Sequence, residues 1–550
     1  MTSLTPHLTV GAQLAEIVRH HERAPAADAR RRVLEISGRV RINDPERQAT
    51  RSTCSNSGGM RQRIVIASAL ILRPALVIAD EPTTALDVTV QAEVLRTFKA
   101  VVEHTGTSIL VTHDLGVVAG ACDEVAVMYA GRIVERTDTV RLFHAPRHPY
   151  TKALLACCPG LAADPGAPLR TIDGAPLRRR PATNRAVPSG RAAPMRWRAA
   201  PRSGPTSSSA APRRRRTWPP ATSRRCRERA AARGRALRVH FPVRTPGGGR
   251  ALLHAVDDVS FVLAPGETLG VVGESGCGKS TLARALLRLV PVSGGRLRFQ
   301  GEDYTHAGER ALGPLRRAVR MVFQDPLASL DPRCTVGDSV REPLDIFEPR
   351  TPRPVRRRAA LAMLEHVGLG ADFGARYPHE LSGGQNQRVN IARALIGGPR
   401  LVICDESVSA LDVSIQAQIL NLLAELQRET GIALLFISHD LSVVRHVSRR
   451  LLVLYLGRVM ESGDAARIFA APRHPYTRAL IDAVPVPDPV RARAAAAPLV
   501  GGELPSPLEP PSGCVYRTRC PRASPLCKIT APPLASAPGG VSAACHHPLE

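Results

Sequence analysis

A glycine-rich stretch of nine residues, at positions 273–281, constrains the fold of this chain more than any other feature. It follows the apolar run 269–272, which is typical of a buried strand, and it precedes Leu282, Leu286 and Leu289 at helical spacing. A strand, a glycine loop ending in Lys-Ser and a helix form the full context of a phosphate-binding P-loop. The nine residues are Gly273, Glu274, Ser275, Gly276, Cys277, Gly278, Lys279, Ser280 and Thr281.

The residue types of this loop match the chemistry of a bound polyphosphate. Gly276 and Gly278 allow the backbone to curl, so that successive N–H groups point inward at phosphate oxygens. The helix that follows directs the positive end of its dipole at the same anions. Lys279 is long enough to contact the outer phosphates, and the hydroxyl of Ser280 is suited to ligate Mg²⁺. The loop therefore predicts a nucleoside triphosphate site.

The chain is long enough for several domains. Its 550 residues are 44% hydrophobic, which indicates about two to four domains with apolar cores. No apolar run approaches the roughly 20 residues that a membrane span needs. Residues 1–6 lack the basic and then apolar pattern of a secretory signal. We expect a cytosolic protein, or one that is peripheral to a membrane.

The strong positive charge of the chain is concentrated in one segment. Residues 178–235 contain 18 arginines, no lysine and one acid, and they account for +17 of the net charge of +27. The segment has no hydrophobic periodicity, so we interpret it as a disordered linker. Two alternatives are that Arg213–Arg216 contact nucleic acid, and that the segment is coding sequence read out of frame. We expect no nucleic-acid partner.

The chain contains an internal repeat of domain size. A Ser-Gly-Gly segment, a helix, an apolar strand ending in Asp-Glu and a later strand ending in His occur twice in the same order. A His-Pro-Tyr-Thr segment follows each copy. The first copy has no P-loop: only 55 residues precede Asn56, whereas 108 positions separate Gly273 from Leu381. Corresponding positions are Asp80 and Asp405, Glu81 and Glu406, Asp87 and Asp412, and His113 and His439.

Strand ends in the second copy carry the polar residues that hydrolysis requires. The carboxyl ends of parallel strands meet at one edge of a sheet, beside the P-loop. There Asp405 is suited to hold Mg²⁺, and Glu406 is suited to act as general base toward water. Gln324 follows a short strand, where it can ligate Mg²⁺ or sense the outer phosphate. His439 also ends a strand, and we expect it near the same phosphate.

These motifs together resemble the ATP-binding subunit of an ABC transporter, and residues 237–485 resemble a complete one. The matching motifs are Walker A at 273–281, the Q-loop at Gln324, the LSGGQ signature at 381–385, Walker B at 401–406, the D-loop at 409–412 and the switch histidine His439. Phe241 stands where the family has an aromatic residue that stacks on adenine. The His-Pro-Tyr-Thr segments and the cysteine-containing tail resemble the dipeptide/oligopeptide importer branch.

The resemblance implies that two ATPase domains enclose ATP and Mg²⁺ head to tail. Each nucleotide lies between the Walker A of one domain and the signature of the other. In this chain one complete site is expected, with Lys279, Ser280, Gln324, Asp405, Glu406 and His439 capped by Ser57, Gly58 and Gly59 of the first copy. The second signature supplies a further anion-binding helix end through Ser382, Gly383, Gly384 and Gln385. The mirror site lacks a Walker A, which leaves Glu81 and His113 without a nucleotide unless another ATP-binding subunit supplies the missing part.

The resemblance also implies a function in import. We expect an ATP-hydrolysing subunit at the cytoplasmic face of the cell membrane, energising uptake of dipeptides or oligopeptides. Its partners would be two transmembrane permease subunits and an extracellular substrate-binding protein. Two alternatives remain: a twin ABC ATPase that acts on ribosomes or DNA, and a degenerate, inactive gene product.

Four cysteines near the C-terminus form a further candidate site. Cys514, Cys520, Cys527 and Cys545 do not have the paired spacing of a zinc ribbon. The family resemblance implies a 4Fe–4S cluster held by the four thiolates. Zinc bound together with His546 or His547 is an alternative, and so is a tail with free thiols.

The expected fold is α/β, with two P-loop NTPase domains of the ABC type joined by the arginine-rich linker. The predicted parts are a truncated domain without Walker A at 1–160, the linker at 161–236, a complete domain at 237–485 and a tail at 486–550. In the truncated domain we expect that 76–79 and 109–111 lack the strands that would cover them.

Overall fold

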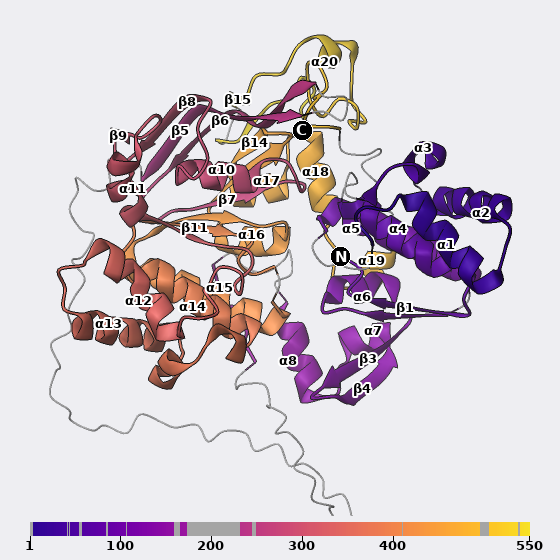
Figure 1. The fold of residues 1–550 in the computed structure, drawn as a ribbon, viewed down its shortest axis with the longest axis horizontal. Coiled ribbons are helices and arrows are strands. Elements are labelled where there is room, and N and C mark those ends of the chain that lie inside the picture. The colour runs from indigo at the N-terminus through magenta and orange to yellow at the C-terminus, as the bar shows by residue number, and fades with distance from the viewer. Residues whose placement is uncertain are drawn as a thin grey trace, which may run out of the picture.

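The computed structural model describes most of both halves of the chain and of the C-terminal tail. The described residues are 4–40, 42, 44–53, 58–83, 86–105, 107–158, 166–172, 231–244, 249–409, 411–494, 505–536 and 540–550. Most of the basic segment at 178–235, together with Ser57, lies outside them. Figure 1 shows the first half, in indigo to purple, beside the larger second half, in pink to yellow. None of the described helices is both long enough and apolar enough to cross a membrane.

The second half is built on a twisted sheet of eight strands. Strand order is β10-β11-β12-β7-β13-β14-β16-β15, and β10 to β13 run parallel around β7. Every residue of β7, β11 and β12 is buried, as expected for a parallel sheet that is covered on both faces. The strands are β7 (Thr268–Val272), β10 (Val319–Val322), β11 (Leu401–Asp405), β12 (Ala433–Ile437), β13 (Arg450–Tyr455), β14 (Arg458–Asp464), β15 (Ala535–Ser536) and β16 (Ser542–Ala543).

A second, antiparallel sheet packs beside this core in the order β6-β5-β8-β9. Its strands are β5 (Ala232–Arg244), β6 (Arg250–Leu263), β8 (Gly294–Phe299) and β9 (Glu302–Asp303). Strand β5 begins at Ala232, so the structured part starts before position 237 and includes the end of the expected linker. Buried and exposed residues alternate from Ala232 to Val239, and arginines occupy exposed positions of the alternation. That arginine content concealed the strand in the sequence.

Helices cover the sheets of the second half and form a helical layer below them in Figure 1. Helix α10 ends at Leu286, and Leu289 is 52% exposed. The helix is therefore about one turn shorter than the spacing of its leucines predicts. The chain leaves the helix because Arg288 adopts a left-handed conformation three residues before Pro291. The helices are α10 (Lys279–Leu286), α11 (Gly313–Ala318), α12 (Val336–Phe347), α13 (Arg353–His366), α14 (Gly383–Leu395), α15 (Val413–Thr430), α16 (Leu441–Val447), α17 (Ala465–Ala470), α18 (Pro475–Asp482), α19 (Pro489–Ala494) and α20 (Pro525–Ile529), with short 3-10 turns at Glu309–Leu312, Ala371–Ala375 and Pro378–Glu380.

The first half repeats these elements but divides its sheet in two. Strands β1 and β2 form one parallel pair, and β3 and β4 form a separate antiparallel pair. In the second half β7 joins the equivalent strands β12 and β13, whereas no strand lies between β2 and β3 in the described part of the first half. The strands are β1 (Leu76–Asp80), β2 (Thr107–Val111), β3 (Glu124–Tyr129) and β4 (Arg132–Asp138).

The absence of a joining strand leaves apolar side chains uncovered. Ile78 is 65% exposed and Ile109 is 48% exposed, although the corresponding strands of the second half are fully buried. A separate helical core is intact, since Val10, Leu14 and Val18 of α1 are buried against helix α4 and its neighbours. The helices are α1 (Val10–Glu22), α2 (Ala26–Arg39), α3 (Pro45–Ala49), α4 (Gly58–Leu70), α5 (Val88–Thr105), α6 (Leu115–Ala121), α7 (Thr139–His144) and α8 (Pro149–Cys157).

Each half contributes a segment that packs on the other. Residues 166–172 lie on α15, where Asn421 exchanges two hydrogen bonds with the backbone of Leu169, at 2.9 and 2.8 Å. In return α19 packs on α6 and α7 of the first half, and Arg493 donates to the carbonyl of Cys122 at 3.0 Å. The halves are therefore held together by reciprocal contacts.

Candidate functional site

The glycine loop adopts the conformation of a phosphate cradle between β7 and α10. Gly273 and Gly278 have φ values of +150° and +102°. A Cβ atom would lie 2.2 Å from the carbonyl oxygen of Leu454 at Gly273, and 2.1 Å from that of Ala255 at Gly278. Only glycine meets both the backbone conformation and the space at these two positions.

The ammonium group of Lys279 lies within the cradle. Its Nζ donates to the carbonyl oxygens of Gly273, at 2.7 Å, and of Glu274, at 3.1 Å. Burial alone would lower the pKa of Lys279, but Cys277 and the carboxylate of Asp87 outweigh that effect and raise it. The lysine is therefore a buried cation, and phosphate oxygens can replace the loop carbonyls as its hydrogen-bond acceptors.

The predicted magnesium ligands converge beside this lysine. The hydroxyl of Ser280 donates to Asp405 Oδ1 at 3.0 Å, which joins the start of α10 to the end of β11. Burial raises the pKa of Asp405, and the hydrogen bond from Ser280 opposes that rise. Gln324 Nε2 donates to Glu406 Oε2 at 2.8 Å. Hydroxyl, carboxylate and amide oxygens at one edge of the sheet are the ligand types that Mg²⁺ prefers.

Glu406 and His439 form a partly buried pair at the same edge. His439 Nδ1 lies 3.6 Å from Glu406 Oε2, and their side chains are 20% and 17% exposed. Burial would raise the pKa of Glu406, but the neighbouring imidazole of His439 outweighs burial and lowers it. Burial would likewise lower the pKa of His439, but the nearby carboxylate of Glu406 outweighs burial and raises it. In the first half Glu81 and His113 form the corresponding pair at 2.7 Å, with side chains about twice as exposed.

The first half contacts the P-loop directly. Asp87 Oδ2 accepts a hydrogen bond from the backbone N–H of Ser275 at 2.5 Å, and the hydroxyl of Thr89 donates to Glu274 Oε1 at 2.5 Å. Burial raises the pKa of Asp87. The two residues lie at the start of α5, so the segment after the first Asp-Glu strand rests on the loop of the other half.

The two signature segments begin equivalent helices. Ser382 caps α14, and its hydroxyl and the side chain of Gln385 exchange hydrogen bonds with each other's backbone N–H groups. Ser382 and Gly383 are exposed at this helix end, whereas Gly384 is buried against Ile415. In the first half Gly58 begins α4, and Gly59 packs against Val90 as Gly384 does against Ile415. The predicted contact of Ser57 with nucleotide falls outside the described residues.

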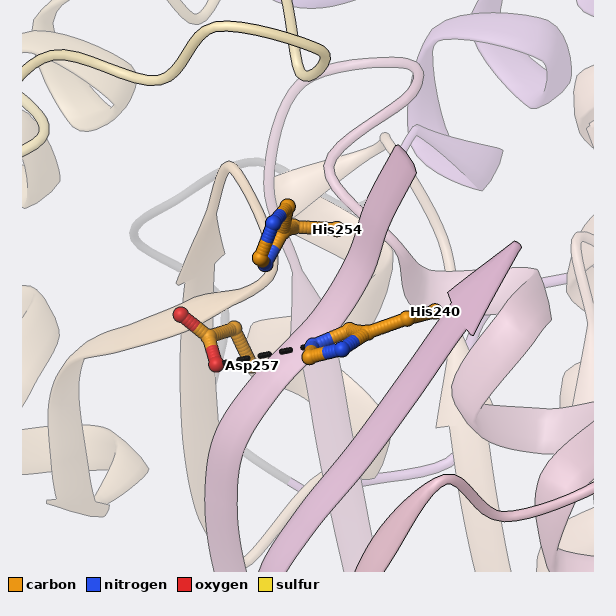
Figure 2. A group of neighbouring side chains, drawn as sticks. All are labelled: His240, His254 and Asp257. Carbon is orange, nitrogen blue, oxygen red and sulfur yellow. Dashed lines mark ion pairs between the residues drawn. The ribbon is translucent and has the colours of Figure 1, made fainter. Parts of the chain in front are cut away.

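Phe241 lies half-buried in β5, packed against the apolar core of the antiparallel sheet. Beside it, His240, His254 and Asp257 form a group with the side-chain types of a metal site, as Figure 2 shows. His240 Nε2 lies 3.7 Å from Asp257 Oδ1, but Arg458 already binds Asp257 Oδ2 with two nitrogens, at 2.7 and 3.0 Å. Since this carboxylate is neutralised by a guanidinium group, we describe the group as an ion-paired cluster and assign it no cation.

Comparison with known proteins identifies the family to which this geometry belongs. The model of the ABC transporter family matches residues 1–84 and 256–409. The glutathione import ATP-binding protein GsiA of Escherichia coli (strain K12) is 45% identical over 509 residues, which cover 92% of this chain and 76% of that protein. The chain belongs to the ABC transporter family. It is accordingly an ABC-type ATPase with the α/β fold of that family.

Further similarities extend beyond the ATPase motifs. The model of the oligopeptide/dipeptide transporter C-terminal region matches residues 134–184 and 460–527. GsiA of Shigella flexneri is 45% identical over 515 residues, with the same coverage of 92% and 76%. A dimeric post-hydrolysis state of the ATP-binding cassette MJ0796, bound to ADP and Pi, is 29% identical at a TM-score of 0.39, and covers 42% of this chain and 98% of its own. Cassette cbiO1 from Clostridium perfringens is 26% identical at the same TM-score, with coverage of 44% and 91%. None of these matches supports the ribosome- or DNA-acting alternative.

The C-terminal cysteines of this ABC ATPase lie near one another. Burial raises the pKa of Cys545 to about 11, and interactions with Cys520, Cys514 and Cys527 add to the rise. All four are free thiols. No three of these sulfur atoms, all within the described tail, lie within 4.8 Å of one another. A single tetrahedral zinc, with Zn–S bonds of about 2.3 Å, would require closer thiols.

The histidines of the tail do not complete a zinc site in this arrangement. His546 Nε2 lies 2.9 Å from the carbonyl oxygen of Thr530, and His547 Nε2 lies 2.7 Å from Ser524 Oγ. Both imidazoles therefore make hydrogen bonds within the tail.

Sequence reasoning missed several residues that contact the Walker A loop. Asp87 was recognised only as a repeat position, and Thr89, Tyr476 and Arg519 were not assigned to the site. The hydroxyl of Tyr476 accepts from the N–H of Glu274 at 3.0 Å, and Arg519 forms an ion pair with the Glu274 carboxylate. Tyr476 belongs to the repeated His-Pro-Tyr-Thr segment, which was the one available signal.

Proposed function

We propose that this ABC ATPase energises the import of short peptides, with glutathione among the candidate substrates. The similarity to glutathione import proteins and the match to the oligopeptide/dipeptide C-terminal region support this assignment. The partners are two transmembrane permease subunits and an extracellular substrate-binding protein, and a further ATP-binding subunit is a candidate for the first half. The chain then acts at the cytoplasmic face of the membrane.

We further propose that each chain assembles one competent ATP site. The observation that carries this proposal is the contact of Asp87 and Thr89, from the first half, with Ser275 and Glu274 of the P-loop. This contact brings the start of α5 to the loop, and α4 with the first signature packs against α5. The mirror site has Glu81 and His113, but the described residues of the first half contain no P-loop.

In the proposed mechanism each polar residue has a separate task. Lys279 leaves the loop carbonyls and binds the outer phosphates. Ser280, Gln324 and Asp405 would hold Mg²⁺, which neutralises phosphate charge. Glu406 accepts a proton from the attacking water, and His439 fixes the Glu406 carboxylate while its ring faces the outer phosphate. Phe241 provides an apolar surface for the adenine ring.

Nucleotide stoichiometry tests the single-site proposal. Glu406→Gln, which keeps the hydrogen-bonding shape but cannot accept a proton, is expected to retain one ATP per chain in rapid gel filtration. Glu81→Gln is the matched control. Its steady-state turnover should stay within about twofold of wild type, because in this proposal Glu81 contacts no nucleotide and substitutions at exposed positions have small effects. Two retained nucleotides, or a large loss of turnover in Glu81→Gln, would contradict the proposal.

An uptake assay tests the transport proposal. Cells that express the chain with its permeases and binding protein should accumulate radiolabelled glutathione or a labelled dipeptide, and Lys279→Ala should abolish that uptake. Accumulation that is independent of Lys279, or co-purification of the chain with ribosomes in place of permeases, would refute the proposed role.

We also propose that Cys514, Cys520, Cys527 and Cys545 hold a 4Fe–4S cluster. The convergence of four free thiols at a spacing too wide for one zinc ion supports this assignment. Anaerobically purified protein should contain iron and sulfide and absorb visible light, and Cys520→Ser should reduce the iron content. Protein that contains no iron and no sulfide under those conditions would exclude the cluster.

A further inference from the structure

Three distant segments of the chain meet at Glu274, the second residue of Walker A. Arg519 of the tail binds its carboxylate with two nitrogens, Nη1 to Oε2 at 2.6 Å and Nη2 to Oε1 at 3.0 Å. Thr89 of the first half and Tyr476 of α18 contact the same residue. The side chains of Arg519 and Glu274 are only 6% and 4% exposed. Two parallel hydrogen bonds between a guanidinium group and a carboxylate fix both charge and orientation.

The charge of Glu274 is a problem for a loop that binds ATP. A buried carboxylate within the loop repels the phosphates electrostatically unless a cation compensates it, because the interior screens charges poorly. The cation of the loop itself, Lys279, contacts the Glu274 carbonyl oxygen and not its carboxylate in this structure. Arg519 provides the compensating charge.

The position of Arg519 depends on the cysteine-containing tail. Arg519 immediately precedes Cys520, and its backbone N–H donates to the carbonyl of Tyr516 at 3.0 Å. The backbone N–H of Cys514 donates to the carbonyl of Cys527 at 2.8 Å, which joins the two ends of the segment that contains Arg519. The guanidinium carbon lies 5.9 Å from the ring centre of Tyr455, which supports the side chain from the core sheet. A change in the fold of the tail would therefore displace the cation that pairs with Glu274.

We propose that Arg519 is a positioning residue that neutralises Glu274 and thereby makes ATP binding at Walker A depend on the fold of the four-cysteine tail. The tail is thus a regulatory element of the nucleotide site. This inference uses the ATP-binding role of the family and holds for any transported substrate, so its tests are independent of the transport proposal.

A charge-removal rescue tests the role of the ion pair. Affinity of the full chain for a fluorescent ATP analogue is measured at equilibrium for each variant. Arg519→Met is expected to weaken binding about tenfold or more, because it leaves the Glu274 charge unpaired. Glu274→Gln combined with Arg519→Met should restore affinity to within about threefold of wild type, since the charge that needed compensation is gone.

Two further variants separate charge from folding. Arg519→Lys keeps the cation with less rigid geometry, and it should bind the analogue within about threefold of wild type even if Arg519→Met fails to fold. Arg517→Met is the matched control in the same tail. The side chain of Arg517 donates to Ser512 and not to Glu274, so affinity should be unchanged. Wild-type affinity in Arg519→Met, loss of affinity in Arg519→Lys equal to that of Arg519→Met, or no rescue by Glu274→Gln, would overturn the proposal.

A third experiment tests the dependence on the tail. Cys520→Ser should weaken binding of the analogue about fivefold or more in the wild-type background, and it should have no further effect in the Glu274→Gln/Arg519→Met background. Cys334→Ser, at an exposed cysteine outside the tail, serves as the control. An equal effect of Cys520→Ser in both backgrounds, or no effect in either, would refute the coupling through Arg519.

Discussion

At the scale of single residues, the backbone at the two Asp-Glu strand ends departs from ordinary strand geometry. Glu406 and Glu81 have φ values of +48° and +47°, which are uncommon for a residue with a side chain. The conformation is retained because each N–H donates to the neighbouring strand, from Glu406 to Ile437 and from Glu81 to Val111, both at 2.9 Å. Strain of this kind is concentrated at functional sites, where it orients a side chain. At Glu406 it turns the carboxylate toward His439.

Two substitutions should separate turnover from binding at this site. Glu406→Gln is expected to reduce kcat by about 10²–10⁴-fold with little change in ATP affinity, because it removes only proton acceptance. Lys279→Ala is expected to weaken ATP binding itself, because it removes the buried cation of the cradle. Steady-state kinetics together with equilibrium binding measure both effects. Full ATPase activity in Glu406→Gln would show that another group acts as the base.

The pair formed by Glu406 and His439 predicts a pH-dependent stability. The pKa of His439 is raised from its usual 6.5. Its contribution to the stability of the folded state is therefore complete below pH 6.5 and is lost as pH rises through the raised pKa. The pKa of Glu406 is lowered from its usual 4.5. Its contribution to the stability of the folded state is therefore complete above pH 4.5 and is lost as pH falls through the lowered pKa. The difference in Tm between wild type and His439→Gln should therefore be largest between about pH 4.5 and 6.5. A difference that stays constant up to pH 9 would contradict this.

At the scale of elements, two strands that differ at one residue have different environments in the two halves. Strand β1 reads Leu-Val-Ile-Ala-Asp and β11 reads Leu-Val-Ile-Cys-Asp. Strand β11 is fully buried among β10, β12 and the covering helices. Strand β1 has exposed residues along its length, and β2 is its one partner among the described strands. Burial here follows from the number of strands in the sheet and not from the strand's own sequence.

A matched pair of substitutions should reveal this difference. Ile403 is completely buried, so Ile403→Ala is expected to reduce the free energy of unfolding by about 2–5 kcal/mol. Ile78 occupies the equivalent position with 65% exposure, and Ile78→Ala should cost about 1 kcal/mol or less. Urea unfolding of the two variants measures both values. Equal losses would mean that another surface covers β1 in solution.

At the scale of the whole molecule, the halves are joined by more than the chain that connects them. Residues 166–172 lie on the second half, α19 lies on the first, and the start of α5 contacts the P-loop. These contacts cross between the halves in both directions, so we expect the halves to stay associated when the chain between positions 173 and 230 is cut.

Cleavage between the halves tests this directly. A protease site inserted near position 205 and then cut should leave the two fragments eluting together in gel filtration, because the reciprocal contacts remain. ATP affinity should stay within about threefold of the uncut chain, since no group at the nucleotide site is removed. Separation of the fragments under native conditions would refute the prediction.

Local patterns determined much of this protein. The P-loop, the strand-end acids and the helix caps are each contiguous in sequence, so spacing and periodicity predicted that Lys279, Asp405, Glu406 and His439 lie at one edge of a sheet. The division of the first sheet, the start of β5 at Ala232 and the contacts of Glu274 were decided by the tertiary structure. Arg519 and Glu274 are 245 residues apart, and a single ion pair across that distance leaves no periodic trace in the chain. Only folding, which places the tail against the edge of the core sheet, brings the two charges together.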